Sequence, residues 1–233
     1  FVSVDNLDKF NKVYDDMDLP HETVIHNYIN AKRILELSKQ DEEVKETFNQ
    51  RELNLVQVSR LVEQKAIDRL IEVHARLIKQ GYTHHMYIIG DGPLRTKLDK
   101  QIKEYKVEDT FTLLGAKKNP YPFMKKADAV CLFSKFEGYP MVLEEAKILR
   151  KYILTTSTSS REVLMNYAGN SMIVTNDDQG IENAIKSITK NKMQKNEKNN
   201  NYVYENNKII DKIVKTIEET KKKEEVKVMW RQE

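Results

Sequence analysis

Short apolar runs recur through the middle of the chain, and a segment with helical spacing follows most of them. Runs of four to eight β-branched and aliphatic residues are typical of buried strands. They are LNLVQVS at 53–59, MYIIG at 86–90, FTLLG at 111–115, AVCLF at 129–133, YILTT at 152–156 and SMIVT at 171–175. Between them, helix-spaced positions include Ile67, Leu70, Ile71, His74, Leu77 and Ile78, and then Leu94, Leu98 and Ile102.

This alternation predicts the fold class. Strands that alternate with helices form an α/β domain, in which a parallel sheet is covered on both faces. Because crossover connections are right-handed, six such strands most simply give a Rossmann-like, doubly wound sheet of order 3-2-1-4-5-6. We expect this domain to cover residues 51–190.

The two ends of the chain have other patterns. HETVIHNYIN at 21–30 contains one plausible strand before a charged, helix-like segment, so residues 1–50 are interpreted as the end of a preceding domain and a linker. In residues 191–233 a polar break precedes a helical stripe at 202–219 and a charged tail. The chain begins with Phe1 rather than Met, so we expect it to be part of a longer protein.

Composition and charge limit the classes of function that the chain can have. Lys and Arg total 39 against 36 Asp and Glu, and a net charge of +3 is too small to indicate a nucleic-acid partner. Cys131 is the single cysteine and lies in an apolar run, so we expect a buried residue in a reducing compartment. No apolar run approaches the roughly 20 residues of a membrane span. The protein is therefore expected to be cytoplasmic.

Metal-binding patterns are not found in the sequence. No cluster of His, Cys and carboxylates has metal-ligand spacing, so no metal or other cofactor is expected. His84 and His85 come just before an apolar run and are interpreted as ordinary edge residues.

Two polar segments follow the first and fourth predicted strands, SRLVEQK at 59–65 and SKFEGYPMVLEEA at 134–146. In the expected sheet these strands flank the point where strand order reverses, which is where ligands bind. Arg60 and Lys65 supply the positive charge that a diphosphate needs. They could also be ordinary exposed bases of a solvated loop, but their position favours ligand binding.

The second predicted strand ends in GDGPLR at 90–95. Gly90 and Gly92 permit a tight turn and a close approach of the backbone, while Pro93 suits the first position of a helix. Ligand contact and a purely structural turn are equally compatible with this pattern. The GxGxxG pattern of a nicotinamide or flavin site is missing.

A helix start is predicted near Pro140, which fits a first helical turn. The positive end of this helix and its free amides would bind a diphosphate. The residues that would present them are Gly138, Tyr139, Pro140, Met141 and Val142, with proline lacking the amide hydrogen itself.

Three carboxylates accompany this helix start. Glu137 precedes it and would face a sugar beyond the phosphates, and Glu145 lies one turn inside. Two carboxylates placed in this way can accept bonds from hydroxyl groups at different ends of an elongated ligand. Glu144 is expected on another face, either solvated or beside Lys147.

These motifs resemble one family. SRLVEQK, GDGPLR, LLG, ADAVCLFSKFEGYPMVLEEA and TSTSSREVL are similar to the donor-binding half of the retaining glycosyltransferases of group 1 (family 4), whose GT-B fold has two Rossmann-like domains. The resemblance covers about residues 53–190. Its acidic signature, two glutamates with seven residues between them, is matched by Glu137 and Glu145.

The resemblance implies a role for each site residue. Arg60 and Lys65 match the pair on the donor diphosphate, Glu137 the glutamate near the transferred sugar, and Glu145 the one on the ribose. The amides of 139–142 would hold phosphate, and the loop 114–116 with Gly115 would border the base. Such enzymes need no bound metal.

The implied activity is that of a retaining hexosyltransferase. A UDP-sugar is the favoured donor and GDP-mannose the alternative, with a glycan or lipid-linked acceptor in polysaccharide synthesis. The acceptor would bind a missing N-terminal domain, so this chain alone is expected to transfer little. A peripheral association with the inner face of the membrane fits this activity. The alternatives are a non-catalytic glycan- or protein-binding partner and a nucleotide-sugar epimerase.

The chain departs from the family pattern at several positions. The family usually has glycine at the position of Ala66, and glycine and proline at those of Arg150 and Tyr152. Glu144 replaces a residue that is usually apolar. None of these changes removes a predicted binding group.

Overall fold

The computed structural model describes residues 1–14, 23–40, 42–48, 52–158, 160–165, 167, 170–190 and 212–219. The chain divides into two compact units. One comprises Phe1–Asn30 and Val203–Glu233, and the other Ala31–Tyr202. The second unit contains all six strands of the sheet and is described first.

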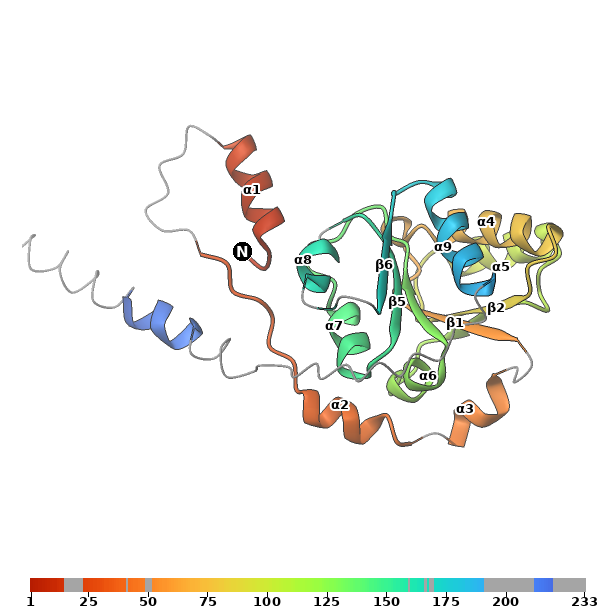
Figure 1. Ribbon diagram of the computed structural model, residues 1–233, viewed down its shortest axis with the longest axis horizontal. Helices are drawn as coiled ribbons and strands as arrows, with labels where there is room; N and C mark the ends of the chain where they lie inside the picture. The colour runs from red at the N-terminus through yellow and green to blue at the C-terminus, as the bar shows by residue number, and fades with distance from the viewer. Residues whose placement is uncertain are drawn as a thin grey trace, which may run out of the picture. The chain divides into compact units, whose positions relative to one another are not determined.

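Six parallel strands form one sheet in the order β3-β2-β1-β4-β5-β6, which confirms the predicted order (Figure 1). Each strand falls within one of the six apolar runs. Their bounds are β1 Leu53–Val58, β2 His84–Ile89, β3 Phe111–Gly115, β4 Ala129–Leu132, β5 Tyr152–Thr156 and β6 Ser171–Val174.

Helices cover both faces of the sheet (Figure 1). The layer on one face consists of α4 Ile67–Lys79, α5 Arg95–Tyr105 and α9 Asp178–Lys190, in which α4 packs between the other two. The opposite layer consists of α6 Tyr121–Lys126, α7 Met141–Ile148 and α8 Ser160–Leu164, with α2 Ala31–Leu37 and α3 Glu42–Thr47 packed against it. A short 3₁₀ helix, η1 Glu63–Lys65, precedes α4.

The core follows from the alternation of side chains along each strand. Leu55, Met86 and Cys131 face the α4 side and join one buried apolar cluster with that layer. Tyr87, the residue after Met86, instead stacks on Phe48 with ring centroids 4.7 Å apart. Cys131 is fully buried as predicted, and burial raises the pKa of its thiol.

The smaller unit contains α1 Val4–Val13, where Ser3 caps the helix by accepting a bond from the Asn6 amide at 3.1 Å. Residues 23–30 form no strand, so the strand predicted in 21–30 is wrong for the described part. Their backbone bonds include a pair shared with the first residue, Phe1 N to Thr23 O and Ile25 N to Phe1 O, rather than a ladder.

Part of the C-terminal prediction can be compared with the structure. Residues 212–219 are helical, in agreement with the stripe at 202–219, while 202–211, most of the polar break and the tail from 220 lie outside the described residues. Among the described helices, none combines the length and the apolar character that crossing a bilayer requires.

Two positions where the family usually has glycine have a left-handed backbone. Ala66, at the start of α4, has φ of 49°, and Arg150, after α7, has φ of 56°. A β-carbon costs about 1 kcal/mol in this region, whereas glycine adopts it freely. We therefore expect these two departures to reduce stability without touching the predicted binding groups.

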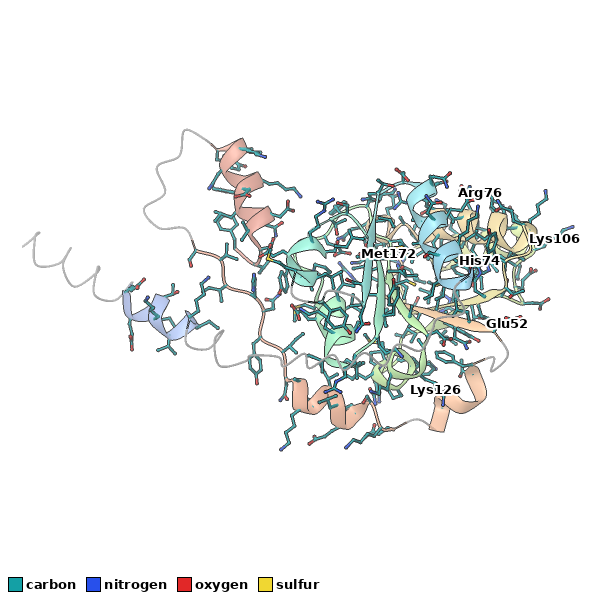
Figure 2. The ribbon with its side chains drawn as sticks, in the orientation of Figure 1. Glu52, His74, Arg76, Lys106, Lys126 and Met172 are labelled. Atoms are coloured by element: carbon teal, nitrogen blue, oxygen red, sulfur yellow. The ribbon has the colours of Figure 1, made fainter. Side chains whose placement is uncertain are left out.

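His84 and His85 are not edge residues. They open β2, which lies between β1 and β3, and both are buried. His84 Nε2 lies 2.9 Å from His74 Nδ1, and His74 Nε2 lies 2.9 Å from Thr110 Oγ1. His74 belongs to the α4 layer (Figure 2). His74 therefore has a partner for each ring nitrogen and His84 has one for Nε2, contacts that apolar patterning cannot reveal.

Burial lowers the pKa of His74 to about 2 and that of His84 to about 4, and neighbouring rings add to this, His84 and His85 acting on His74 and His85 acting on His84. Both rings are neutral in the folded protein at pH 7. Since the unfolded chain titrates near 6.5, it binds more protons than the folded one below that pH. Their contribution to stability is complete above pH 6.5 and declines as the pH falls toward 4.

We predict that Arg150→Gly raises the free energy of unfolding by about 1 kcal/mol, because it removes left-handed strain at an exposed position. Lys100→Gly, an exposed position inside α5, is the control and should lower stability by about 1 kcal/mol. Urea unfolding of the three proteins measures both effects. Destabilisation by both glycines would contradict the assigned strain.

We predict that the free energy of unfolding falls by about 1 kcal/mol for each of these two rings between pH 7 and 5.5. His74→Gln should be less stable at pH 7.5, and its free energy of unfolding should fall less between pH 7 and 5.5, because one of the two titrating rings is gone. Thr110→Val removes a hydrogen bond but no titrating group, so its dependence should equal that of the wild type. Urea unfolding across this range measures the slopes, and equal slopes for all three proteins would refute the prediction.

Candidate functional site

The loops that follow β1 and β4 meet at the point where the strand order reverses. β1 pairs with β2 on one side and with β4 on the other. The Lys135 amide donates to Gln64 O at 2.8 Å, and Gln64 Nε2 donates to Phe136 O at 2.9 Å. The two predicted site segments are thus joined directly.

An ion pair joins the same two loops. Lys65 Nζ lies 2.5 Å from Glu137 Oε1, and the two side chains are only 15% and 8% exposed. Lys65 ends η1, which places it at the mouth of the β1 loop. At such low exposure the pair is screened weakly by solvent, so an anion that binds Lys65 must compete with the Glu137 carboxylate.

Arg60 lies two residues beyond β1 and is exposed. Its side chain makes no hydrogen bond or ion pair with the described part of the chain. The neighbouring backbone is fixed, because the Leu61 amide donates to Asp91 O at 3.0 Å and Leu61 O accepts from the Leu94 amide at 3.2 Å. Arg60 therefore combines an available guanidinium with an anchored backbone.

Gly90 and Gly92 make this anchoring possible. A β-carbon on Gly90 would lie 2.0 Å from Ser59 O, and one on Gly92 would lie 2.5 Å from Leu61 O. Gly90 also has φ of 144°, which other residues rarely adopt. The glycines thus permit close packing of the β2 loop on the β1 loop, whatever contact they make with a ligand.

Gly115 ends β3 beside the same loop. Its φ is 75°, and its carbonyl accepts from the Gly90 amide at 2.9 Å. Arg95 Nη2 donates to Leu113 O at 3.0 Å, which ties α5 to the end of this strand. The three predicted glycines therefore belong to neighbouring strand ends.

The helix start predicted near Pro140 is present with a shift of one position. α7 begins at Met141, and Pro140 precedes it with an extended ψ of 93°. Pro140 O accepts from the Leu143 amide at 3.0 Å, so the Met141 and Val142 amides come ahead of the first helical bond. Such amides carry the partial positive charge of a helix N-terminus.

Glu145 contacts a residue that the sequence analysis did not single out. Tyr121 Oη donates to Glu145 Oε1 at 3.2 Å. Burial raises the pKa of Glu145, and the bond from Tyr121 opposes this rise. Burial and the neighbouring carboxylate raise the pKa of Tyr121 to about 12, so its hydroxyl keeps its proton at neutral pH.

Glu144 lies beside Lys147, as one of the two predicted alternatives states, but it is buried rather than solvated. Its Oε2 lies 3.1 Å from Lys147 Nζ, and its Oε1 accepts from Tyr139 Oη at 2.8 Å. Lys147 Nζ also donates to Val163 O at 2.7 Å. This network ties the turn before α7 to α8, and none of its members is evident from helix spacing.

Arg69 and Asn176 also hold the site loops and were missed. Arg69 Nη2 on α4 donates to Phe133 O at 3.0 Å and to Asn176 Oδ1 at 2.8 Å. Asn176 Nδ2 donates to Lys135 O at 2.7 Å. The only sequence signal is an arginine within the apolar spacing of α4, which does not identify a partner 107 residues away.

The described residues offer no obvious metal centre. In this part of the chain, no group of three or more His, Cys, Asp or Glu side chains is arranged to hold a metal ion. Of the four charged residues predicted for the site, Lys65 and Glu137 are in direct contact with each other.

Comparisons with known proteins identify a family whose sequences match this chain. The family model "Glycosyl transferases group 1" matches residues 38–209. An uncharacterized glycosyltransferase of Methanocaldococcus jannaschii is 32% identical over 111 residues, which are 47% of this chain and 27% of that protein. The amylovoran biosynthesis glycosyltransferase of Erwinia amylovora is 30% identical over 102 residues, or 44% of this chain and 28% of that protein.

A third relative is a Campylobacter jejuni enzyme, an N-acetylgalactosaminyltransferase named for a diphospho-undecaprenol-linked substrate. It is 32% identical over 123 residues, which are 53% of this chain and 31% of that enzyme. The matched region thus spans less than a third of these relatives.

Solved structures share the fold. Anabaena Alr3699/HepE in complex with UDP superposes with a TM-score of 0.68 at 18% identity, over 84% of this chain and 57% of that one. A variant of TarM from S. aureus, in complex with fondaparinux, alpha-GlcNAc-glycerol and UDP, gives a TM-score of 0.62 at 19% identity, over 88% and 41% of the two chains.

Proposed function

The chain belongs to the glycosyl transferases group 1 family, and from that membership we propose that it forms the nucleotide-sugar-binding domain of a retaining hexosyltransferase. The observation that carries the proposal is the junction of the β1 and β4 loops at the switch point, where Lys65 and Glu137 meet. Basic and acidic groups at one junction of low solvent exposure suit a ligand with a diphosphate and sugar hydroxyls.

Each group then has a part in donor binding. Arg60 and Lys65 bind the diphosphate together with the amides that open α7. Glu137 accepts bonds from the transferred sugar and is the catalytic residue, and Glu145 accepts from the ribose. The β2 and β3 loops border the nucleotide, through Gly90, Gly92 and Gly115.

We propose that the donor is a UDP-sugar, with GDP-mannose as the alternative, and that donor binding needs no metal. UDP is the ligand named for the HepE and TarM complexes, which supports the choice of base. The acceptor is a glycan or a lipid-linked glycan. The relatives named for amylovoran biosynthesis and for an undecaprenol-linked substrate support this class.

The whole protein is proposed to include an N-terminal acceptor domain, because the matched region is less than a third of the length of these relatives. In this arrangement residues 1–50 are the end of the N-terminal domain and a linker, 51–190 bind the donor, and 191–233 contain the helix that crosses back. Catalysis takes place in the cytoplasm, where the acceptor would lie at the inner face of the membrane.

We predict that Arg60→Ala weakens UDP binding by roughly tenfold or more, because a charge-assisted bond to phosphate is lost. Arg150→Ala is the matched control, since Arg150 is also exposed but precedes β5, at the opposite end of the sheet. Calorimetric titration with UDP and GDP, with and without EDTA, measures affinity, base preference and any need for a metal. Equal affinities of both variants, or no nucleotide binding by the wild type, would overturn the proposal.

For the whole enzyme, we predict that Glu137→Gln lowers turnover by about a hundredfold or more, because a charged partner of the reacting sugar is lost. UDP affinity should not fall, since Lys65 is then released from its carboxylate partner. Initial rates with a radiolabelled UDP-sugar, together with UDP titration, separate the two effects. Unchanged turnover would remove Glu137 from catalysis, and donor conversion without acceptor would indicate an epimerase.

A further inference from the structure

The stretch Asn119–Pro122 forms a rigid turn at the start of α6. Asn119 Nδ2 donates to Leu37 O at 2.9 Å and to Gln40 Oε1 at 3.1 Å, so its side chain holds the end of α2. Its Oδ1 accepts from the Tyr121 amide at 3.3 Å. One side chain thus fixes the backbone of Tyr121 to a neighbouring helix.

Two prolines restrict this turn further. Pro120 and Pro122 flank Tyr121, and each proline fixes its own φ and limits the residue before it. Pro122 is buried, as are the two residues that follow it. The side chain of Tyr121 therefore starts from a backbone that has little freedom, and ordering it costs little entropy when a ligand binds.

From this fixed position the side chain of Tyr121 contacts α7. Its hydroxyl bond to Glu145 Oε1 joins residues 24 positions apart in the chain. Oε2 of the same carboxylate makes no hydrogen bond with the described residues. A carboxylate with one oxygen held and the other available has a defined direction in which it can accept a further bond.

We infer that Tyr121 is a positioning residue for the nucleotide, holding the Glu145 carboxylate so that its second oxygen accepts a bond from a ribose hydroxyl. This inference rests on the proposed function. It assigns the Asn119–Pro122 turn to recognition of the sugar attached to the base, and it predicts a preference for ribonucleotides over deoxyribonucleotides.

The surrounding charges agree with this role. Arg33 on α2 favours the ionised form of Tyr121, in opposition to burial and Glu145. On α7 itself, Glu144 and Lys147 are paired with each other. Burial works against the charge on Glu145, and the hydrogen bond from Tyr121 favours it. Removing the hydroxyl therefore weakens both the orientation and the charge of the acceptor.

A tyrosine that only connects α6 to α7 would make the same hydrogen bond. The test must therefore compare ligands that differ only in their ribose hydroxyl groups. Tyr121→Phe keeps the ring and removes the hydroxyl. The control is Tyr167→Phe, which removes the bond from Tyr167 Oη to Lys151 O, ahead of β5. Glu145→Gln gives the result expected when the ionised acceptor is lost.

The experiment measures calorimetric dissociation constants for UDP and for 2′,3′-dideoxy-UDP. We expect the wild type and Tyr167→Phe to prefer UDP by roughly tenfold or more. In Tyr121→Phe the ratio of the two constants should fall by about fivefold, and in Glu145→Gln it should approach one. Thermal unfolding midpoints show whether each variant is folded.

The outcomes separate the inference from the proposed function. If the wild type binds neither nucleotide, the proposed function fails and the inference fails with it. If the wild type prefers UDP and Tyr121→Phe keeps the full ratio, even with weaker binding of both ligands, Tyr121 is only a structural tie. If the wild type binds both nucleotides equally, Glu145 does not contact the ribose and the inference is overturned.

Discussion

The site depends on the junction between the loops after β1 and β4. A parallel sheet leaves a gap where its crossovers turn to opposite sides, and the chain fills this gap with polar groups. Two backbone carbonyls and the Lys65 to Glu137 pair join the loops across it. Separating a buried ion pair leaves a charge without its partner, which is costly. The pair therefore favours the arrangement in which the two loops stay in contact.

A second set of contacts, made by side chains of α4 and α7, fixes the segments next to this junction. Arg69 connects the end of β4 to the end of β6, and Glu144 connects the turn before α7 to α8 through Lys147. These residues sit on helices, whose backbones are rigid. Groups held in this way keep their geometry when a ligand arrives, so little of the binding energy is spent on ordering them.

The sequence was sufficient to predict the sheet, because strand order follows from apolar runs, helical spacers and the handedness of crossovers. It also indicated which loops would meet. It could not predict contacts between distant polar side chains, such as Tyr121 with Glu145 or Arg69 with Asn176. His84 was misread for the same reason, and for Glu144 the choice between solvent and Lys147 stayed open, since burial of both residues depends on hydrogen-bond partners that spacing does not identify.

The close contact made by Gly90 and Gly92 has a consequence for how such a chain can diversify. Any side chain at either glycine would push on the backbone that carries Arg60, so the first two strand ends behave as one block. Substitution then has little freedom at these two strand ends. Evolutionary variation is expected instead in segments outside this block, where a substitution leaves the backbone that carries Arg60 in place.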